Sequence, residues 1–176
     1  AVFSFTASSF DFSSIAIGDS IAVNGVCLTA VEVGRDFFKA DVSQETLNCS
    51  IFSKLEQGMR VNLEKALRLN QGIDGHLVSG HVDGIAQVSE QFSEGESTRF
   101  KISAPDNLVK YIARKGSVCI NGVSLTVNSI NGNTFDLNIV PHTLSVTTLG
   151  ELKTGDQVNL EVDIIARHLE QLLNNK

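Results

Sequence analysis

The sequence predicts an all-β fold made of two similar domains, and three observations support this prediction. Residues 112–161 align with residues 15–64 at a constant offset of 97 positions, and 17 of these 50 pairs are identical. Short segments rich in Val, Ile, Phe and Thr recur in both halves, several with the period-2 alternation of half-buried strands. Asn-Gly pairs at 24–25 and 121–122 are typical of tight hairpin turns between such strands. Many short strands in a duplicated pattern favour closed barrels or sandwiches.

The individual elements follow from these patterns, and helices are expected to be few. The stretch 164–173 places four apolar residues on one face after Asp163, a candidate N-cap, and is predicted to be helical. A shorter helix is predicted over 105–116, where apolar residues precede a Gly stop, with 8–18 as its repeat partner. The expected strands lie within 20–29, 37–42, 61–63, 118–120, 125–127, 135–140 and 158–162.

The repeat also predicts the domain boundaries. We expect an N-terminal barrel over 1–75, a C-terminal barrel over 76–163 and a C-terminal helix over 164–176. The segment 80–88 resembles the opening strand of the second domain, and its counterpart would fall before residue 1. The first domain is therefore expected to lack its opening strand, and roughly 15–25 residues would precede Ala1 in the natural protein. A helix of ten residues cannot bury its apolar face alone, so it packs on a barrel or joins other copies of the chain.

Composition excludes several classes of function. Net charge is −6 with 14 Lys and Arg, and the chain has one Tyr and no Trp, which argues against a nucleic-acid partner. No apolar run is long enough to span a membrane, so no membrane association is expected. Three cysteines form an odd set without metal-ligand spacing, which favours free thiols in a reducing cytoplasm.

The motif Asn-Gly-Val-Cys/Ser-Leu-Thr occurs once in each half and presents paired polar side chains. Cys27 and Thr29 lie on one face of their predicted strand, as do Ser124 and Thr126. Two small hydrogen-bonding groups one strand step apart suit the edge of a flat heterocycle. The other interpretation is a packed strand whose hydroxyls bond to backbone groups. Cys27 is the sharper candidate of the pair, because a thiol in general ionises more readily than a hydroxyl. Its alternative role is that of a small buried apolar residue.

The junction between the halves contains two histidines in the segment Gly75-His-Leu-Val-Ser-Gly-His81. Glycines on both sides allow the backbone to approach a ligand closely. His81 is a candidate general acid or base near neutral pH, and a purely structural histidine is the alternative. No Cys or carboxylate completes a metal-ligand set, and the glycine spacing fits neither a dinucleotide fingerprint nor a phosphate loop. We therefore expect no metal site.

Taken together, these motifs resemble the riboflavin synthase family (alpha chain). The resemblance rests on Asn-Gly-Val-Cys-Leu-Thr29, Gly75-His-Leu-Val-Ser-Gly-His-Val-Asp-Gly84, Lys115-Gly-Ser-Val-Cys-Ile-Asn-Gly-Val-Ser-Leu-Thr126 and Pro141-His-Thr-Leu144, and covers essentially the whole chain. It implies two homologous six-stranded Greek-key barrels and a C-terminal helix through which three chains associate. It also implies transfer of a four-carbon unit between two molecules of 6,7-dimethyl-8-ribityllumazine, which gives riboflavin and a ribitylamino-pyrimidinedione.

The same resemblance implies a set of site residues and partners. Each barrel would bind one lumazine without a metal or redox cofactor, at the contact between the N-barrel of one subunit and the C-barrel of its neighbour. Association with lumazine synthase is a further implied partnership. The implied residues are Ser20, Val26, Cys27, Leu28, Thr29, Asp41, Val42, Ser43, Gln44, Glu45, Thr46, Gly80, His81 and Val82 for the first barrel, and Lys115, Ser124, Leu125, Thr126, Val140, Pro141, His142, Thr143 and Asp163 for the second.

Within this set the resemblance gives the catalytic roles as hypotheses. His81 and Thr126 would relay protons at one ligand, while Cys27 and Ser20 would lie at C7 of the other; Ser124 is the repeat counterpart of Cys27. Much of the rate would come from holding two large reactants face to face. Two departures from the family stand out: the opening Met-Phe-Thr-Gly-Ile is absent, and Asn121 replaces an Asp of some members, which we expect to affect hydrogen bonds to the ribityl chain.

The main alternative is a non-catalytic relative that binds one lumazine or flavin as an optical antenna. Such proteins typically lose the Gly-His-Leu-Val-Ser-Gly-His pattern and the second barrel's pocket. Both are intact in this sequence, which favours the enzyme.

Overall fold

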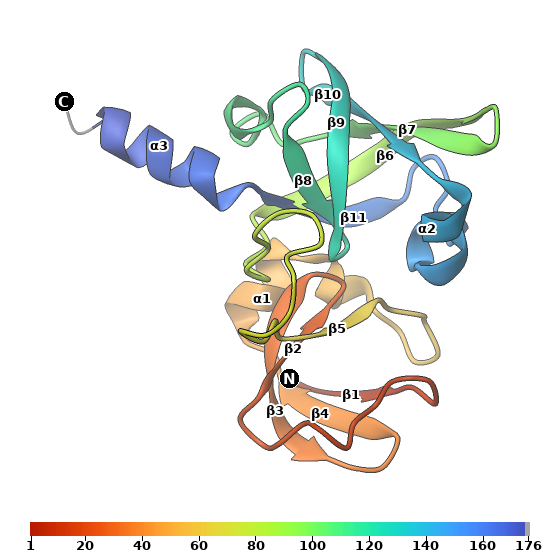
Figure 1. Cartoon of the computed structure of the whole chain (residues 1–176), viewed down its shortest axis with the longest axis vertical. Helices are drawn as coiled ribbons and strands as arrows, with labels where there is room; N and C mark the ends of the chain where they lie inside the picture. Colours follow the sequence, from red (N-terminus) through yellow and green to blue (C-terminus); the bar gives the residue numbers. More distant parts are fainter. Residues whose placement is uncertain (175–176) are drawn as a thin grey trace.

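The computed structural model describes residues 1–174 and consists of two stacked β units with a projecting C-terminal helix (Figure 1). The first unit is a five-stranded antiparallel sheet in the order β1-β4-β3-β2-β5. Its strands are β1 Val2–Thr6, β2 Ser20–Val23, β3 Val26–Val33, β4 Phe37–Asp41 and β5 Leu63–Lys65. The Asn24-Gly25 turn joins β2 to β3, as the sequence predicts.

The second unit is a closed six-stranded barrel in the order β10-β7-β6-β11-β8-β9, which confirms the predicted Greek-key barrel. Its strands are β6 Gly84–Glu94, β7 Ser97–Ser103, β8 Ser117–Ile120, β9 Val123–Asn131, β10 Thr134–Ile139 and β11 Gln157–Val162. Strand β6 pairs with both β7 and β11 and so closes the barrel.

The repeat offset relates the two units strand by strand. β1, β2, β3, β4 and β5 correspond to β7, β8, β9, β10 and β11, and within the described residues β6 has no counterpart in the first unit. Strands β1 and β7 were not among the predicted segments, because Ser4 in β1 and Arg99 and Lys101 in β7 interrupt the apolar pattern. The opening strand was expected over 80–88, but β6 begins only at Gly84, since the preceding residues form the contact between the units.

The helical predictions were partly wrong. Over 105–116 there is only a 3₁₀ turn, Val109–Tyr111, and the segment 8–18 forms turns without a helix. A single turn is enough to bury Leu108 and Ile112. Two short helices follow β4 and β10 instead: α1, Gln44–Cys49, and α2, Pro141–Val146, each continued by a 3₁₀ turn, Ile51–Lys54 and Thr148–Glu151. Their signals were the Ser43 cap and Pro141 at the first helical position.

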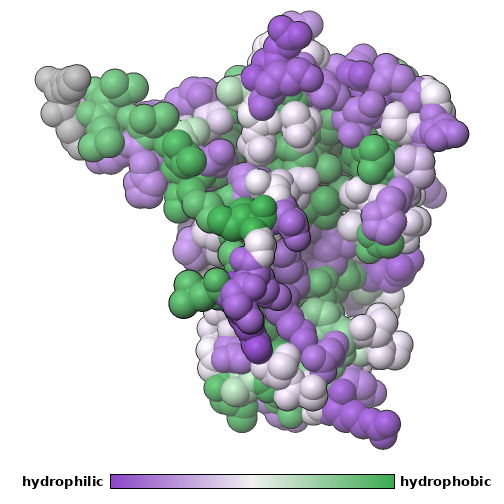
Figure 2. Space-filling model, in the orientation of Figure 1, coloured by the Kyte–Doolittle hydropathy of each residue, from purple (hydrophilic) through white to green (hydrophobic). Residues whose placement is uncertain are grey.

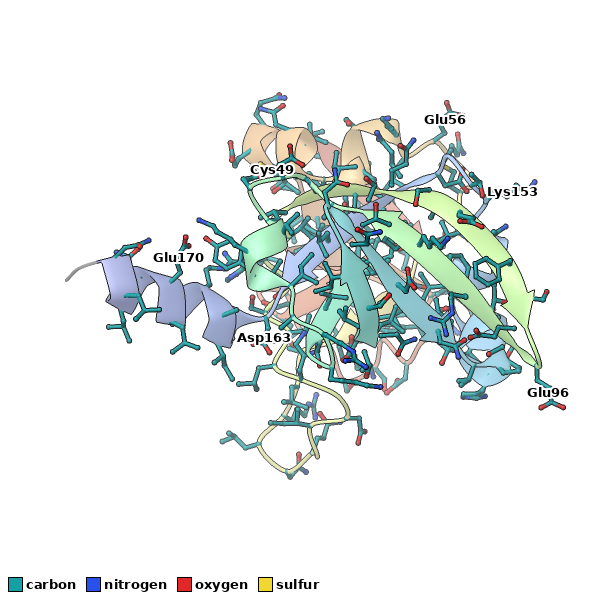
Figure 3. The ribbon with its side chains drawn as sticks, turned by 90° about the horizontal axis from the view of Figure 1, so that it is seen from above. Cys49, Glu56, Glu96, Lys153, Asp163 and Glu170 are labelled. Atoms are coloured by element: carbon teal, nitrogen blue, oxygen red, sulfur yellow. The ribbon has the colours of Figure 1, made fainter. Side chains whose placement is uncertain are left out.

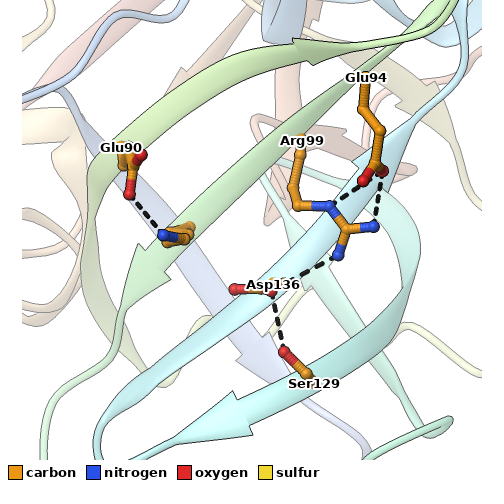
Figure 4. A network of polar contacts seen from close by, with 6 residues as sticks. Glu90, Glu94, Arg99, Ser129 and Asp136 are labelled. Atoms are coloured by element: carbon orange, nitrogen blue, oxygen red, sulfur yellow. Dashed lines mark hydrogen bonds and ion pairs between the residues drawn. The ribbon is translucent and has the colours of Figure 1, made fainter.

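Each unit has its own apolar core. Phe38 and its repeat counterpart Phe135 are almost fully buried at the two centres. The first core adds an aromatic group in which Phe5 lies 5.1 Å from Phe38 between ring centroids. The barrel's outer face is instead polar: Arg99 binds Glu94 and Asp136 across neighbouring strands (Figure 4). The alternation of apolar inner and polar outer residues accounts for the sheet registers.

The C-terminal helix α3, Ile164–Asn174, leaves the barrel at Asp163 and points away from both units (Figure 3). Residues 175–176 of the predicted C-terminal segment lie outside the described part. Its apolar face is exposed to solvent along the projecting arm (Figure 2). The exposed residues are the four predicted for that face, Ile165, Leu169, Leu172 and Leu173. No helix among the described residues is long and apolar enough to cross a membrane.

Candidate functional site

The two Asn-Gly hairpin turns meet at the contact between the units. Asn24 and Asn121 have φ values of 45° and 47°, and the glycines that follow have φ values of 78° and 86°. A Cβ on Gly25 would lie 2.7 Å from the backbone nitrogen of Gly122, so only glycine permits this approach. The turns therefore bring the first residues of β3 and β9 close together.

Two further asparagines lock this contact with repeat-related hydrogen bonds. The Nδ2 group of Asn62 donates to the Asn121 carbonyl at 2.9 Å, and that of Asn159 donates to the Asn24 carbonyl at 2.8 Å. Each side-chain oxygen accepts from the backbone of the opposite unit, Asn62 from Thr148 and Asn159 from Ile51. These bonds fix the relative position of the two predicted ligand-binding strands.

Beside this contact lies a cavity of about 380 Å³, large enough for part of a flat heterocycle. Four predicted site residues border it: Ser20 and Cys27 from the first unit, Ser124 from the second, and Gly80 from the segment between them. The remaining lining residues are Ala22, Glu64, Lys65, Ala66, Leu67, Ile73, Asp74, His76, Leu77, Val78, Ser79 and Gly122.

The connecting segment lies against the equivalent position of each repeat. The backbone N–H of Cys27 donates to the Gly80 carbonyl at 2.8 Å. A Cβ on Gly80 would lie 2.7 Å from the Cys27 Cβ, and one on Gly75 would lie 2.6 Å from the Ser124 Oγ. Both glycines have positive φ, 77° at Gly80 and 120° at Gly75. One Gly-His pair thus contacts Cys27, and the other contacts Ser124.

His76 pairs with the Ser124 hydroxyl. The Nδ1 and Oγ atoms are 2.7 Å apart, and Nε2 is buried without a hydrogen-bond partner among the described residues. Burial lowers the pKa of His76, partly opposed by Asp163 and Glu161, so its neutral form is favoured at pH 7. A neutral imidazole within hydrogen-bond distance of a hydroxyl can accept its proton.

The three cysteines are free and differ in environment. Burial raises the pKa of Cys119 to about 12, which keeps it a thiol. A hydrogen bond to Glu45 raises the pKa of Cys49, with the Sγ–Oε1 distance at 3.1 Å. Cys27 borders the cavity, and within the described part of the chain its thiol makes no hydrogen bond.

The other residues predicted for the first barrel lie along the end of β4 and the start of α1. Asp41 is the last strand residue and Gln44 begins the helix, so the chain passes from strand to helix within this run of predicted site residues. The physical reason is the cap, because the Ser43 hydroxyl accepts from the Thr46 N–H at 3.0 Å. Glu45 is exposed in the same turn.

Six more first-barrel residues divide into core and surface. The side chains of Val26, Leu28 and Val42 belong to the core, so only their backbone groups are available to a ligand. Thr29 is exposed on the outer face of β3. After Gly80, His81 is exposed and Val82 packs against the first core.

The residues predicted for the second barrel lie in the repeat-equivalent region. Thr126 and Lys115 are exposed, and Leu125 packs against the barrel core. Val140 precedes α2, which begins at Pro141 and also contains His142 and Thr143. No hydrogen bond joins His81 to Thr126 within the described chain, so the proposed proton relay would need groups on different copies of the chain.

Two remaining predictions concern residues near the unit contact. Asp163 caps α3, where its carboxylate accepts from the Ile165 N–H at 2.9 Å. Asn121 is 3% exposed, and its side-chain oxygen accepts from the Asn159 N–H at 2.8 Å. The Asn121 side chain is therefore buried in the contact between the units, and its effect on ribityl hydrogen bonds stays a prediction.

The sequence reasoning missed four polar residues that organise the site: His76, Asn62, Asn159 and Glu161. Glu161 is 2% exposed and accepts hydrogen bonds from Ser79 and Gly80. For Asn62, Asn159 and Glu161 the sequence did contain a signal, because Val-Asn-Leu-Glu recurs at 61–64 and 158–161, which are equivalent positions of the two repeats. No group of three His, Cys, Asp or Glu side chains suited to a metal ion occurs in the described residues.

Comparison with known proteins agrees with this geometry. The lumazine binding domain model matches residues 2–66 and 79–163. Riboflavin synthase of Photobacterium phosphoreum is 47% identical, with 93% of this chain and 75% of the relative covered. That of Brucella abortus is 45% identical, with 93% and 83% covered. The crystal structure of LumP complexed with riboflavin matches with a TM-score of 0.83 at 29% identity, covering 92% of this chain and 87% of LumP. The chain therefore belongs to the riboflavin synthase family of lumazine-binding proteins.

Proposed function

We propose that this protein is a riboflavin synthase, a transferase that acts on two molecules of 6,7-dimethyl-8-ribityllumazine. One molecule gives up a four-carbon unit and leaves as 5-amino-6-ribitylamino-2,4-pyrimidinedione, while the other accepts the unit and becomes riboflavin. One observation supports this proposal above all: Cys27 and Ser124 occupy equivalent strand positions, and a Gly-His pair contacts each. Donor and acceptor are the same compound, so two copies of one site suit the reaction.

The proposed first site uses Ser20 and Cys27 at C7 of one lumazine, with the N-terminal turn of α1 and the Gly80–Val82 backbone around its ring. The second site uses Ser124 and Thr126, with the start of α2 and Lys115. Asp163 would bind the ribityl chain as well as cap α3. The two domains are proposed to span 1–75 and 76–163, and the reaction needs no metal or redox cofactor.

Three chains are proposed to form the active assembly. The exposed apolar face of α3 would bury itself against the same helix of two neighbours. His81 and Thr126 would then meet across subunits, which agrees with the absence of a bond between them in one chain. A cytoplasmic location and association with lumazine synthase complete the proposal.

The direct test is to incubate the protein with 6,7-dimethyl-8-ribityllumazine alone and measure riboflavin by absorbance and chromatography. Riboflavin and the pyrimidinedione should form in equal amounts. A folded protein that gives no riboflavin would reject the enzyme. Cys27→Ala and His81→Ala should each lower kcat, and near-parental turnover in both would show that positioning outweighs side-chain acid–base chemistry.

The second candidate is a lumazine-binding antenna protein, which the similarity to LumP favours. The riboflavin synthases of comparable coverage are more similar in sequence, at 37–47% against 28–30% for LumP. Fluorescence titration distinguishes the candidates, because the enzyme should bind two lumazines per chain and the antenna one.

A further inference from the structure

The carboxylate of Glu161 is buried beside the proposed site and binds the connecting segment. Its Oε1 atom accepts from both the N–H and the hydroxyl of Ser79 at 2.7 Å, and Oε2 accepts from the Gly80 N–H at 3.0 Å. Arg167 forms an ion pair with Asp83, and among the described residues Glu161 has no ion-pair partner. A buried carboxylate is costly unless it is hydrogen-bonded or paired, and three donors from two adjacent residues satisfy this one.

Gly80 is thereby held from both units at once. Its N–H is bound by Glu161 of β11, and its carbonyl accepts from Cys27 of β3. Its positive φ and its close approach to the Cys27 Cβ leave no room for a side chain. Any shift of Gly80 would therefore change the surroundings of Cys27 and the position of His81, the next residue.

We propose that Glu161 is a positioning residue that fixes Ser79 and Gly80, and through them sets the placement of Cys27 and His81. Its expected effect on turnover rests on the proposed function, whereas its effect on the connecting segment does not. The repeat counterpart, Glu64, lacks this arrangement: within the described residues it makes no side-chain hydrogen bond and is exposed. Glu64 is thus a matched control for the same chemical change.

The test compares Glu161→Gln with Glu64→Gln in the full chain. Glutamine keeps the size of glutamate but replaces one acceptor oxygen with an NH₂ donor that faces another donor. In Glu161→Gln, amide exchange at Ser79, Gly80 and Cys27 should accelerate about tenfold or more, as loss of a charge-assisted hydrogen bond implies. The amides of β4 should keep their protection, and Glu64→Gln should leave the exchange at Ser79 and Gly80 unchanged.

Two further measurements distinguish positioning from general destabilisation. Alkylation of Cys27 by iodoacetamide, resolved from Cys49 by peptide mass spectrometry, should become faster with an altered pH profile in Glu161→Gln. With 6,7-dimethyl-8-ribityllumazine as substrate, the fold decrease in kcat should be larger than the fold increase in KM. Ser79→Ala removes one of the three donors and should give intermediate effects, which provides the test if Glu161→Gln does not fold.

Two results in folded Glu161→Gln would overturn the positioning role. One is an amide exchange rate at Ser79 and Gly80 equal to that of the parent, and the other is an alkylation profile of Cys27 equal to that of the parent. Faster exchange with unchanged kcat would also overturn it. If the parent protein itself forms no riboflavin, the proposed function fails, and exchange and alkylation still decide whether Glu161 positions Cys27.

Discussion

The two repeats share five strands in the same order but differ at one edge. In the second unit β6 joins β7 to β11 and closes the barrel, whereas the corresponding edges of β1 and β5 are unpaired in the described chain. A second cavity of about 380 Å³, lined partly by residues 60–64, lies along β5. The difference lies in β6, which pairs with both β7 and β11 and has no counterpart in the first unit within the described residues.

The largest expected loss of stability comes from replacing the equivalent core phenylalanines by alanine. Phe135→Ala should cost about 5 kcal/mol of unfolding free energy, near the upper end for Phe→Ala, because a closed barrel relaxes little around a cavity. Phe38→Ala should cost about 3 kcal/mol, since free strand edges let the first sheet collapse. Urea denaturation measures both. An equal or larger loss for Phe38→Ala would show that the open sheet is as rigid as the closed one.

The equivalent asparagines at the unit contact should give the next largest effect. Asn159→Ala leaves the Ile51 N–H and the Asn24 carbonyl without partners at a buried position, and should cost about 2–3 kcal/mol. Asn62 is half-buried and makes the same two kinds of bond, so Asn62→Ala should cost about 1–2 kcal/mol, because water can replace its partners. Thermal and urea unfolding test the order, and a larger loss at Asn62 would contradict it.

This comparison also shows which features the sequence could predict. The offset of 97 residues located both hairpins, most strands and the absent counterpart of β6, because turn residues and apolar alternation are local signals. Helices α1 and α2 were missed because six residues are too few for a helical period, although Ser43 and Pro141 marked their starts. The predicted site residues Cys27 and Ser124 do lie on one cavity.

The polar contacts around that cavity were not predictable from spacing. His76 reaches Ser124, and Glu161 reaches Gly80, across 48 and 81 residues of sequence respectively. Such bonds depend on how the units pack, and a single repeat contains no information about the segment that crosses between them. The identical segment Val-Asn-Leu-Glu in both repeats indicated that these residues matter for the fold. It did not distinguish a buried carboxylate from an exposed one.

The smallest effect on the free energy of unfolding should come from Glu64→Gln, and its sign should be opposite to that of Glu161→Gln. The Glu64 carboxyl is partly desolvated even though the residue is solvent-accessible, and this desolvation raises its pKa above the ordinary value. The folded state therefore binds the proton more tightly than the unfolded state does. The stability of the parent therefore falls as pH rises from the ordinary glutamate pKa through the raised one. Glu64→Gln removes this loss and should stabilise the protein at pH 7, within about 0.5 kcal/mol because the side chain is exposed and screened. The gain should shrink as the pH falls below the ordinary glutamate pKa, because both states then become protonated.

Urea unfolding midpoints of the parent, Glu64→Gln and Glu161→Gln at pH 4 and pH 7 measure this contrast. Glu161→Gln should be less stable than the parent at pH 7, because the amide cannot accept all three hydrogen bonds from Ser79 and Gly80. If Glu64→Gln also lost stability at pH 7, the Glu64 carboxylate would have a stabilising partner, and the two repeats would treat this glutamate alike. Opposite signs would instead show that the connecting segment, and not the repeated strand, determines the role of the carboxylate.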